Sequence, residues 1–182
     1  MKYGFLMLFF LAAMQPAIGQ SNTTNDLQKK YDETMTLFFY KNTLRMINQQ
    51  ENKEFDEMIQ NIEKMEFILV DRNKSNFGKA EYKELIGEYQ KERFESIVTS
   101  RIEGRNFDVF LRDAKGSKPG TVVLVSDSSN LYILDIVGTI DISKVGSLFN
   151  KLGVNEDVST RIRRFVDPES DTTRRRRRSS PH

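Results

Sequence analysis

The sequence of 182 residues contains no cysteine, no tryptophan and one histidine. Without cysteine the chain has no disulfide, no thiol nucleophile, no thiolate ligand for zinc and no cysteine-linked lipid anchor. The one histidine is His182, the last residue, so we expect no Ser-His-Asp triad and no histidine-anchored metal site inside the fold. Glycine-rich phosphate loops and His-Glu-x-x-His motifs are also missing. The sequence therefore predicts no catalytic residue, no metal site and no cofactor, and we expect a protein that is not an enzyme.

The composition is typical of a globular protein, with 38% hydrophobic residues and a formal net charge of +2. The length corresponds to one domain with additional tails. Residues 20–166 contain 22 Lys and Arg against 23 Asp and Glu, so the positive balance comes from the ends of the chain. We predict a single domain over residues 20–166, with a different kind of segment at each end.

The first nineteen residues have the pattern of an export signal. Lys2 provides a positive charge ahead of the apolar run Phe5–Ala13, and Pro16 follows the run. Ala17 and Gly19 stand at the small-residue positions of a cleavage site that ends before residue 20. A transmembrane helix needs about 20 apolar residues, which this interrupted run does not supply. We therefore predict a signal peptide over residues 1–19, a periplasmic or secreted protein, and no transmembrane helix after cleavage.

Residues 167–182 contain no hydrophobic residue, so we predict a disordered tail. The tail includes five consecutive arginines: Arg174, Arg175, Arg176, Arg177 and Arg178. Such a run can bind the phosphates or sulfates of an anionic surface through charge and paired N–H donors, or it can keep the protein soluble. Anionic lipid and polysaccharide are the candidate surfaces. We do not expect nucleic acid, because the body shows neither a basic face nor a nucleic-acid module.

The first half of the domain mixes helical and strand patterns. We predict a short helix or lead-in over Asp26–Asp32, a buried strand over Met35–Tyr40 and a short helical stretch over Leu44–Ile47. A firmer helix is indicated by apolar residues at helical spacing, namely Phe55, Met58, Ile59, Ile62 and Met65. A second buried strand is predicted over Phe67–Val70, and a further helix over Lys79–Glu92.

From Phe94 onward the apolar period changes to two, which is typical of strands. Four strands joined by short turns predict an antiparallel meander, in which the last two, Thr121–Ser126 and Leu131–Val137, are apolar on both faces and should lie centrally. Asp141 is a plausible N-cap for a final helix. The sequence thus predicts an α+β fold, a mostly antiparallel sheet of the four-strand C-terminal meander and two N-terminal strands, covered by helices.

The export signal, the segment Leu37–Ile47 (LFFYKNTLRMI) and the strand pair Thr121–Asp127 and Leu131–Ser143 together resemble the domain-of-unknown-function family 4252. The resemblance covers roughly residues 26–152 and is best marked where Gly138-x-x-Asp141 leads into the last helix. It implies a small exported protein of a bacterial envelope, a compact α+β domain and no established activity. Members often carry a lipid-anchoring cysteine after the signal, which this chain lacks.

Carboxylates are the remaining route to acid–base chemistry. Asp135 stands in the middle of the apolar segment Leu131–Val137. If it is buried, its pKa would rise, and a second carboxylate nearby could complete an acid–base pair. The alternative is structural: Asp135 lies on a partly open face, or pairs across strands with Arg112 or Arg101. The turn Asp127–Asn130 could in principle chelate a cation, although turn chemistry alone accounts for its residues.

The aromatic residues offer a candidate contact surface. Phe38, Phe39, Tyr40, Phe107 and Phe110 either line a hydrophobic groove or form core, as their periodicity indicates. Ile97 and Phe110 fall on the face opposite the main apolar set of their strands, so side-by-side exposure of the two would mark a contact surface.

These observations leave three classes of function. The first is an exported, non-enzymatic binding or interaction domain whose partner is an unknown protein or envelope component. The second is a hydrolase of carboxylate type that uses Asp135. The third is a protein that binds anionic lipid or polysaccharide through its arginine tail.

Overall fold

The computed structural model describes residues 20–31, 34–48, 51–102, 104–113 and 118–151. The predicted signal peptide and the arginine tail lie outside these ranges. The first elements in chain order are α1 (Asn22–Lys30), β1 (Met35–Tyr40), α2 (Lys41–Ile47), α3 (Lys53–Ile59) and β2 (Ile62–Asp71). They are followed by α4 (Lys79–Lys91), β3 (Glu95–Ile102), β4 (Arg105–Arg112), β5 (Gly120–Ser126), β6 (Asn130–Gly138) and α5 (Ile142–Lys151).

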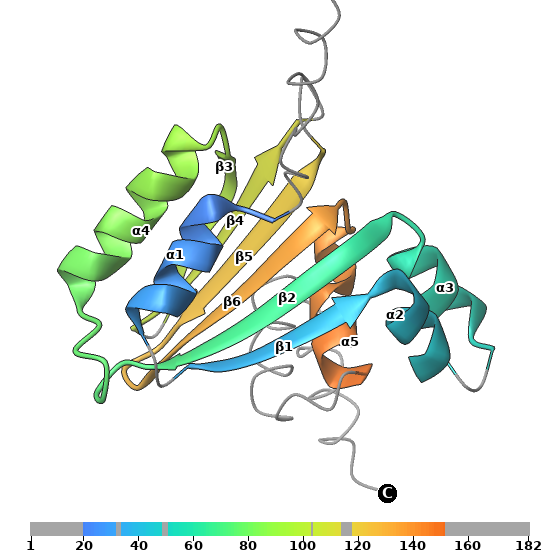
Figure 1. The fold of residues 1–182 in the computed structure, drawn as a ribbon, viewed down its shortest axis with the longest axis horizontal. Coiled ribbons are helices and arrows are strands. Elements are labelled where there is room, and N and C mark those ends of the chain that lie inside the picture. Colours follow the sequence, from blue (N-terminus) through green and yellow to red (C-terminus); the bar gives the residue numbers. More distant parts are fainter. Residues whose placement is uncertain (1–19, 32–33, 49–50, 103, 114–117, 152–182) are drawn as a thin grey trace, which may run out of the picture.

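The strands form one six-stranded antiparallel sheet in the order β1-β2-β6-β5-β4-β3 (Figure 1). The predicted α+β class is confirmed, and so is the meander, because β3 pairs with β4, β4 with β5 and β5 with β6. The two N-terminal strands join this meander where β2 pairs with β6. As expected, β5 and β6 are central, and each is buried along almost its whole length.

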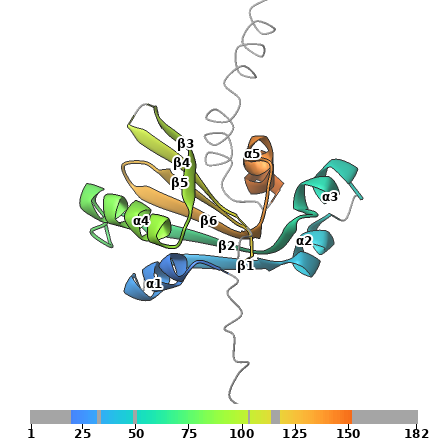
Figure 2. The same cartoon turned by 90° about the horizontal axis from the view of Figure 1, so that it is seen from above.

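Helices cover both faces of the sheet, α1 and α4 on one side and α2, α3 and α5 on the other (Figures 1 and 2). The alternation along β2 divides the core accordingly. Met65 and Phe67 pack with residues of α2, α3 and α5, whereas Ile68 and Val70 pack with residues of α1 and α4. Each face therefore has its own apolar core, and an apolar residue on either face of a central strand is buried.

Local chemistry sets several element boundaries. Ser21 is the N-cap of α1, and its hydroxyl accepts a hydrogen bond from the Thr24 amide. Asp141 has the predicted capping role, because its carboxylate accepts a hydrogen bond from the Ser143 amide at 2.9 Å. The carboxylate of Asp127 accepts hydrogen bonds from two backbone amides of its own turn, each at 2.8 Å. The predicted turn between β5 and β6 is thus confirmed.

Three predicted elements differ from the structure. The helix predicted over Asp26–Asp32 is present as α1 but spans Asn22–Lys30. The predicted helix through Ile62 and Met65 ends at Ile59 as α3, and β2 begins at Ile62, well before the predicted start at Phe67. Spacing alone fits a helix here, but the segment pairs with β1 on one side and β6 on the other. The strand Met35–Tyr40 is present as β1, yet it forms the edge of the sheet and is largely exposed rather than buried.

Candidate functional site

The outer edge of β1 carries most of the exposed large hydrophobic side chains among the described residues. Met35, Leu37, Phe38 and Tyr40 have exposed fractions of 46%, 38%, 43% and 56%. They lie on both faces of the strand, because Leu37 is opposite Phe67 of β2 and Phe38 is opposite Glu66. We call these four residues the β1 edge.

The β1 edge contains no charge, no proline and no irregularity in its pairing with β2. On the side of Phe38 and Tyr40, the ammonium group of Lys64 lies 5.1 Å and 5.6 Å from the two ring centroids. These distances are within the range of cation–π contacts, which are attractive. Within the described residues, β2 is the only strand paired with β1, so one side of its backbone is left without a strand neighbour.

The opposite edge of the sheet is protected in the usual way. β3 carries charged residues at Glu95 and Arg101, and its pairing with β4 shifts between Ser96 and Val98, which marks a β-bulge. Charges and bulges on an edge strand discourage pairing with another chain. The two edges of this sheet therefore differ in chemistry, and only β1 offers an uncharged, regular edge.

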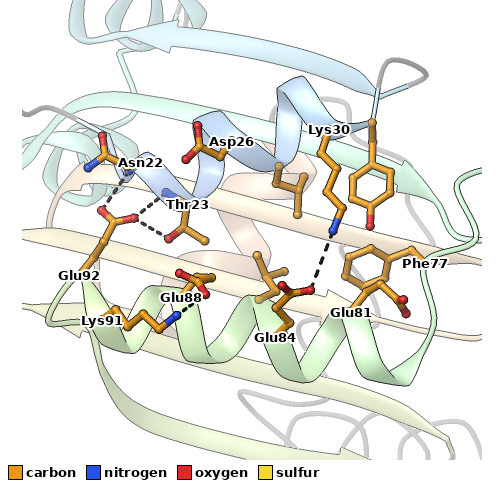
Figure 3. Close-up of a pocket in the computed structure, with 13 residues that line it drawn as sticks. Asn22, Thr23, Asp26, Lys30, Phe77, Glu81, Glu84, Glu88, Lys91 and Glu92 are labelled. Carbon is orange, nitrogen blue, oxygen red and sulfur yellow. Dashed lines mark hydrogen bonds and ion pairs between the residues drawn. The ribbon is translucent and has the colours of Figure 1, made fainter.

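A second feature is a pocket of about 390 Å³ between α1 and α4 (Figure 3). Its floor includes Leu27, Phe77 and Leu85, each nearly buried. Its rim is rich in carboxylates, which are Asp26, Glu81, Glu84, Glu88 and Glu92. A volume of this size can hold a small ligand.

The rim carboxylates already have partners within the chain. Asp26 pairs with Lys29, Glu84 with Lys30 at 3.9 Å, and Glu88 with Lys91. Glu81 accepts a hydrogen bond from the Gly78 amide, and Glu92 accepts hydrogen bonds from the Asn22 and Thr23 amides at the start of α1. The rim therefore joins the two helices, and its charges do not converge on an open centre.

A third feature is a buried pair of carboxyl groups on the sheet, beneath α1. Glu66 of β2 lies directly opposite Asp135 of β6, and the two are 0% and 1% exposed. Side chains in this relation have β-carbons about 5 Å apart and point to the same face. Asp135 accepts a hydrogen bond from the Ser21 amide at 3.1 Å. Neither carboxylate oxygen of Glu66 has a hydrogen-bond partner among the described residues.

Burial governs the protonation of this pair. Burial raises the pKa of Glu66 most, the neighbouring Asp135 carboxyl raises it as well, Lys64 lowers it, and the resulting pKa is about 7. Burial also raises the pKa of Asp135, against hydrogen bonds from Thr24 and Ser21 and the positive charge of Arg112. Arg112, one of the predicted cross-strand partners, acts on Asp135 through its charge, while its ion pair is with Glu92 at 3.7 Å. The predicted partly open face is wrong, because Asp135 is 1% exposed.

Glu66 and Asp135 have the composition of an acid–base dyad, but within the described residues a substrate has no open path to them. Residues 20–24 lie over it and are held by Asp135, Glu92 and Tyr89. A substrate would have to displace this segment to reach either carboxyl group. Glu66 was missed by the sequence analysis, since it stands just before the predicted strand; its place next to the apolar run Phe67–Val70 was the available signal.

The predicted contact surface at Ile97 and Phe110 is corrected by the structure. Ile97 is 41% exposed, but Phe110 is 1% exposed and stacks on Tyr89 of α4 with ring centroids 6.0 Å apart. Phe110 does lie on the face opposite Phe107 and Val109, but that face is covered as well. Phe38 and Tyr40 are exposed, whereas Phe107 is core.

Arg174–Arg178 lie outside the described residues, so the structure does not place them. Among the described residues, no group of three or more His, Cys, Asp or Glu side chains is arranged to hold a metal ion. None of the helices in the described ranges has the length and apolar content that crossing a membrane requires.

The β1–β2 pair, the helices α2 to α4 and the meander up to the middle of α5 coincide with a family model. Residues 27–148 match the model of a family described as "Domain of unknown function (DUF4252)". The chain belongs to this family. The resemblance inferred from the sequence is thereby confirmed for the family itself. The DUF4252 domain includes the β1 edge and the Glu66–Asp135 pair but begins after the first residues of α1. The chain matches no curated protein and no solved structure.

Proposed function

We propose that the protein is an exported, non-enzymatic binding domain, and that its β1 edge receives an extended, uncharged segment of a partner protein. The observation that supports this proposal is the concentration of exposed Met35, Leu37, Phe38 and Tyr40 on an edge strand that carries no charge. An extended segment can add to such an edge by main-chain hydrogen bonds, while the side chains on alternate faces select the sequence.

The exposed side chains of the β1 edge can contribute much of the binding free energy when a partner segment buries them. Full burial of a Leu, Phe or Met side chain stabilises a complex by about 1.5–3 kcal/mol, and these residues are close to half exposed in the free chain. The partner's residues opposite β1 should be apolar or small, because β1 has no charge to complement a charged one. Lys64 already lies over the rings of Phe38 and Tyr40, which disfavours a basic side chain at that position.

A photocrosslinking comparison tests the proposal. A photoreactive phenylalanine analogue is placed at Phe38, or at Ile97 on the other edge as a matched control with a similar exposed fraction. The full chain is expressed with its leader in a Gram-negative host, irradiated in cells and analysed by mass spectrometry. We expect an adduct from position 38 alone, mapped to a short apolar segment of another protein and abolished by Leu37→Lys.

Other results would contradict the proposal. Adducts of equal yield from both positions would show that β1 has no special role. An adduct between two copies of this chain would show that the β1 edge serves self-association instead. Protein recovered only from the cytoplasm with its leader intact would contradict export, independently of what position 38 contacts.

A further inference from the structure

The segment that directly follows the predicted cleavage point is unusually well anchored. Gln20, Ser21, Thr23 and Thr24 are all buried, with exposed fractions of 9% or less. The hydroxyl of Ser21 contacts that of Thr24 at 2.7 Å, which in turn contacts the Tyr89 hydroxyl at 2.9 Å. The first residues of a domain are usually poorly ordered unless something holds them. Here the sheet and α4 both hold them.

The charges around this segment do not balance. The acidic groups that face it are Glu66 and Asp135 on the sheet and Glu92 at the end of α4. The basic groups are Lys64, whose ammonium donates to the Gln20 side chain, and Arg112, which lies 3.7 Å from Glu92. The cluster thus has three carboxyl groups and two cations among the described residues, and both Glu66 oxygens are left without a donor.

A buried carboxylate without a donor is costly, and native structures rarely keep one without a reason. The backbone nitrogen of Gln20 is close to the pair. The Ser21 nitrogen is 3.1 Å from Asp135, and consecutive backbone nitrogens are no more than about 3.7 Å apart, so the Gln20 nitrogen is within about 7 Å of that carboxylate. While residue 19 is attached, this nitrogen is an uncharged amide with at most one donor.

We propose that cleavage after Gly19 creates an α-ammonium group on Gln20 that forms an ion pair with Glu66 and Asp135, so that removal of the leader completes a buried site built for the new N-terminus. Hydrolysis of the Gly19–Gln20 bond by a leader peptidase consumes one water and leaves a carboxylate on Gly19 and an ammonium on Gln20. The ammonium brings one positive charge and three N–H donors to the cluster. The inference rests on the proposed export, because only an exported chain is cleaved at this point.

This arrangement makes folding stability depend on processing. The precursor buries Glu66 without a hydrogen-bond donor from the described residues, and the mature chain supplies a donor that also carries a positive charge. The site is therefore a device by which the exported form of the protein is more stable than the form that still carries its leader. The hydrogen bond from the Ser21 amide to Asp135 fixes where the ammonium of Gln20 lies. A chain that begins one residue earlier or later should therefore form a weaker ion pair with Glu66 and Asp135.

The test compares chains released from a fusion with either Gln20 or Gly19 as the first residue. Both have a free amine and equal charge, and they differ by one glycine, which moves the amine away from the pair. At pH 7.5 we expect the equilibrium constant for folding, from urea titration, to be at least tenfold larger for the chain that begins at Gln20. The difference should fall below twofold when both chains carry Glu66→Gln and Asp135→Asn. Glu63→Gln, an exposed change on the same strand, should preserve it.

A second measurement covers the case in which the double variant does not fold. The rate at which an amine-reactive ester labels the α-amine is followed by mass spectrometry in the otherwise unaltered chains. Labelling should be at least tenfold slower for the chain that begins at Gln20. Because an N-terminal glutamine can cyclise with loss of ammonia, which removes the amine, Gln20→Ala is measured in parallel and should behave in the same way.

Equal folding constants and equal labelling rates for the two starting residues would overturn the inference. A stability difference that persists in the Glu66→Gln, Asp135→Asn background would also overturn it, because the pair would then not be the cause. Sequencing of the N-terminus of protein recovered from the periplasm tests export separately. A leader retained on periplasmic protein would contradict cleavage after Gly19 in cells, while the comparison of purified chains still decides whether the site accepts the ammonium.

Discussion

At the scale of single residues, Glu66 is the most consequential side chain of the fold. It is fully buried on the central part of the sheet, opposite another carboxyl group. Its pKa is raised to about 7 in the folded chain, against an ordinary value of 4.5. A proton is therefore held by the folded state over a pH range in which the unfolded state has already released it, so the protonation of Glu66 is linked to stability.

The predicted consequence is a loss of stability as pH rises. Between about pH 4.5 and 7 the folded state binds more protons than the unfolded state at Glu66, so the free energy of unfolding falls with pH and levels off above 7. At about 1.4 kcal/mol per pKa unit, the loss is about 3 kcal/mol. Urea titrations at pH 4.5 and 8, on a chain that keeps residues before Gln20, should show this loss in the unaltered chain and a much smaller one in Glu66→Gln. Parallel pH profiles for the two chains would contradict the assignment.

Tyr82 and Asp108 provide a second prediction at this scale. The hydroxyl of Tyr82 on α4 donates a hydrogen bond to the Asp108 carboxylate on β4, and both residues are buried. Tyr82→Phe leaves a buried acceptor without this donor, which should lower the free energy of unfolding by about 1–3 kcal/mol. Tyr40→Phe, at an exposed tyrosine on β1, is the control and should change it by less than about 0.5 kcal/mol. Equal effects of the two substitutions on thermal unfolding would show that the buried bond contributes nothing.

At the scale of elements, the end of β6 depends on one glycine. Gly138 has a φ of +125°, and a β-carbon there would lie 2.0 Å from the Asn61 carbonyl oxygen, just before β2. We predict that Gly138→Ala lowers the free energy of unfolding by about 1–3 kcal/mol, through strain and displacement of the β2–β6 pair. Gly87→Ala in α4, where an added β-carbon meets nothing within 4 Å, should instead raise it by up to about 1 kcal/mol. Urea titration of the two variants checks both signs.

The elements also show what a pattern of apolar residues can and cannot predict. The alternation after Phe94 predicted the meander, because each strand pairs with the one before it and the turns are short. The spacing of Ile62 and Met65 predicted a helix, because residues three apart share a face in a helix but not in a regular strand. In β2 the two pack in the same core, and the pairing with β6 shifts between Ile62 and Lys64. The apolar pattern also could not distinguish an edge strand from a buried one at Met35–Tyr40, because that depends on which strands lie beside it.

The candidate sites were predictable to different degrees for the same reason. Asp135 stood out as a polar residue within an apolar strand, and its burial follows from the helices that cover both faces. Its pairing with Glu66 could not be predicted, because β2 and β6 are far apart in sequence and their register is set by the whole sheet. Phe110 was misjudged on similar grounds: its face is known from the alternation, but its burial requires α4.

At the scale of the whole molecule, the domain and the arginine tail should be separable. The two apolar cores lie within the described ranges of residues 20–151, and residues 20–166 have nearly equal numbers of acidic and basic side chains. We predict that replacing Arg174–Arg178 with glutamine leaves the free energy of unfolding within about 0.5 kcal/mol of its original value. The same change should abolish retention on heparin and on anionic vesicles in 50 mM salt, because charge-driven binding is strongest at low salt. Each arginine that neutralises an anion should add about one unit to the slope of log affinity against log salt concentration.

The salt series decides whether retention comes from the tail or from the domain. If the five arginines bind the anionic surface, the unaltered chain should elute at a higher salt concentration than the glutamine variant. A Lys29→Gln, Lys30→Gln variant of the domain should elute at the same salt concentration as the unaltered chain. Lys29 and Lys30 are the right control because they are exposed on α1 and already lie near carboxylates. Identical elution of the glutamine variant and the unaltered chain would contradict the tail's proposed role. Binding would then have to come from the domain surface, whose balanced charge gives no reason to expect it.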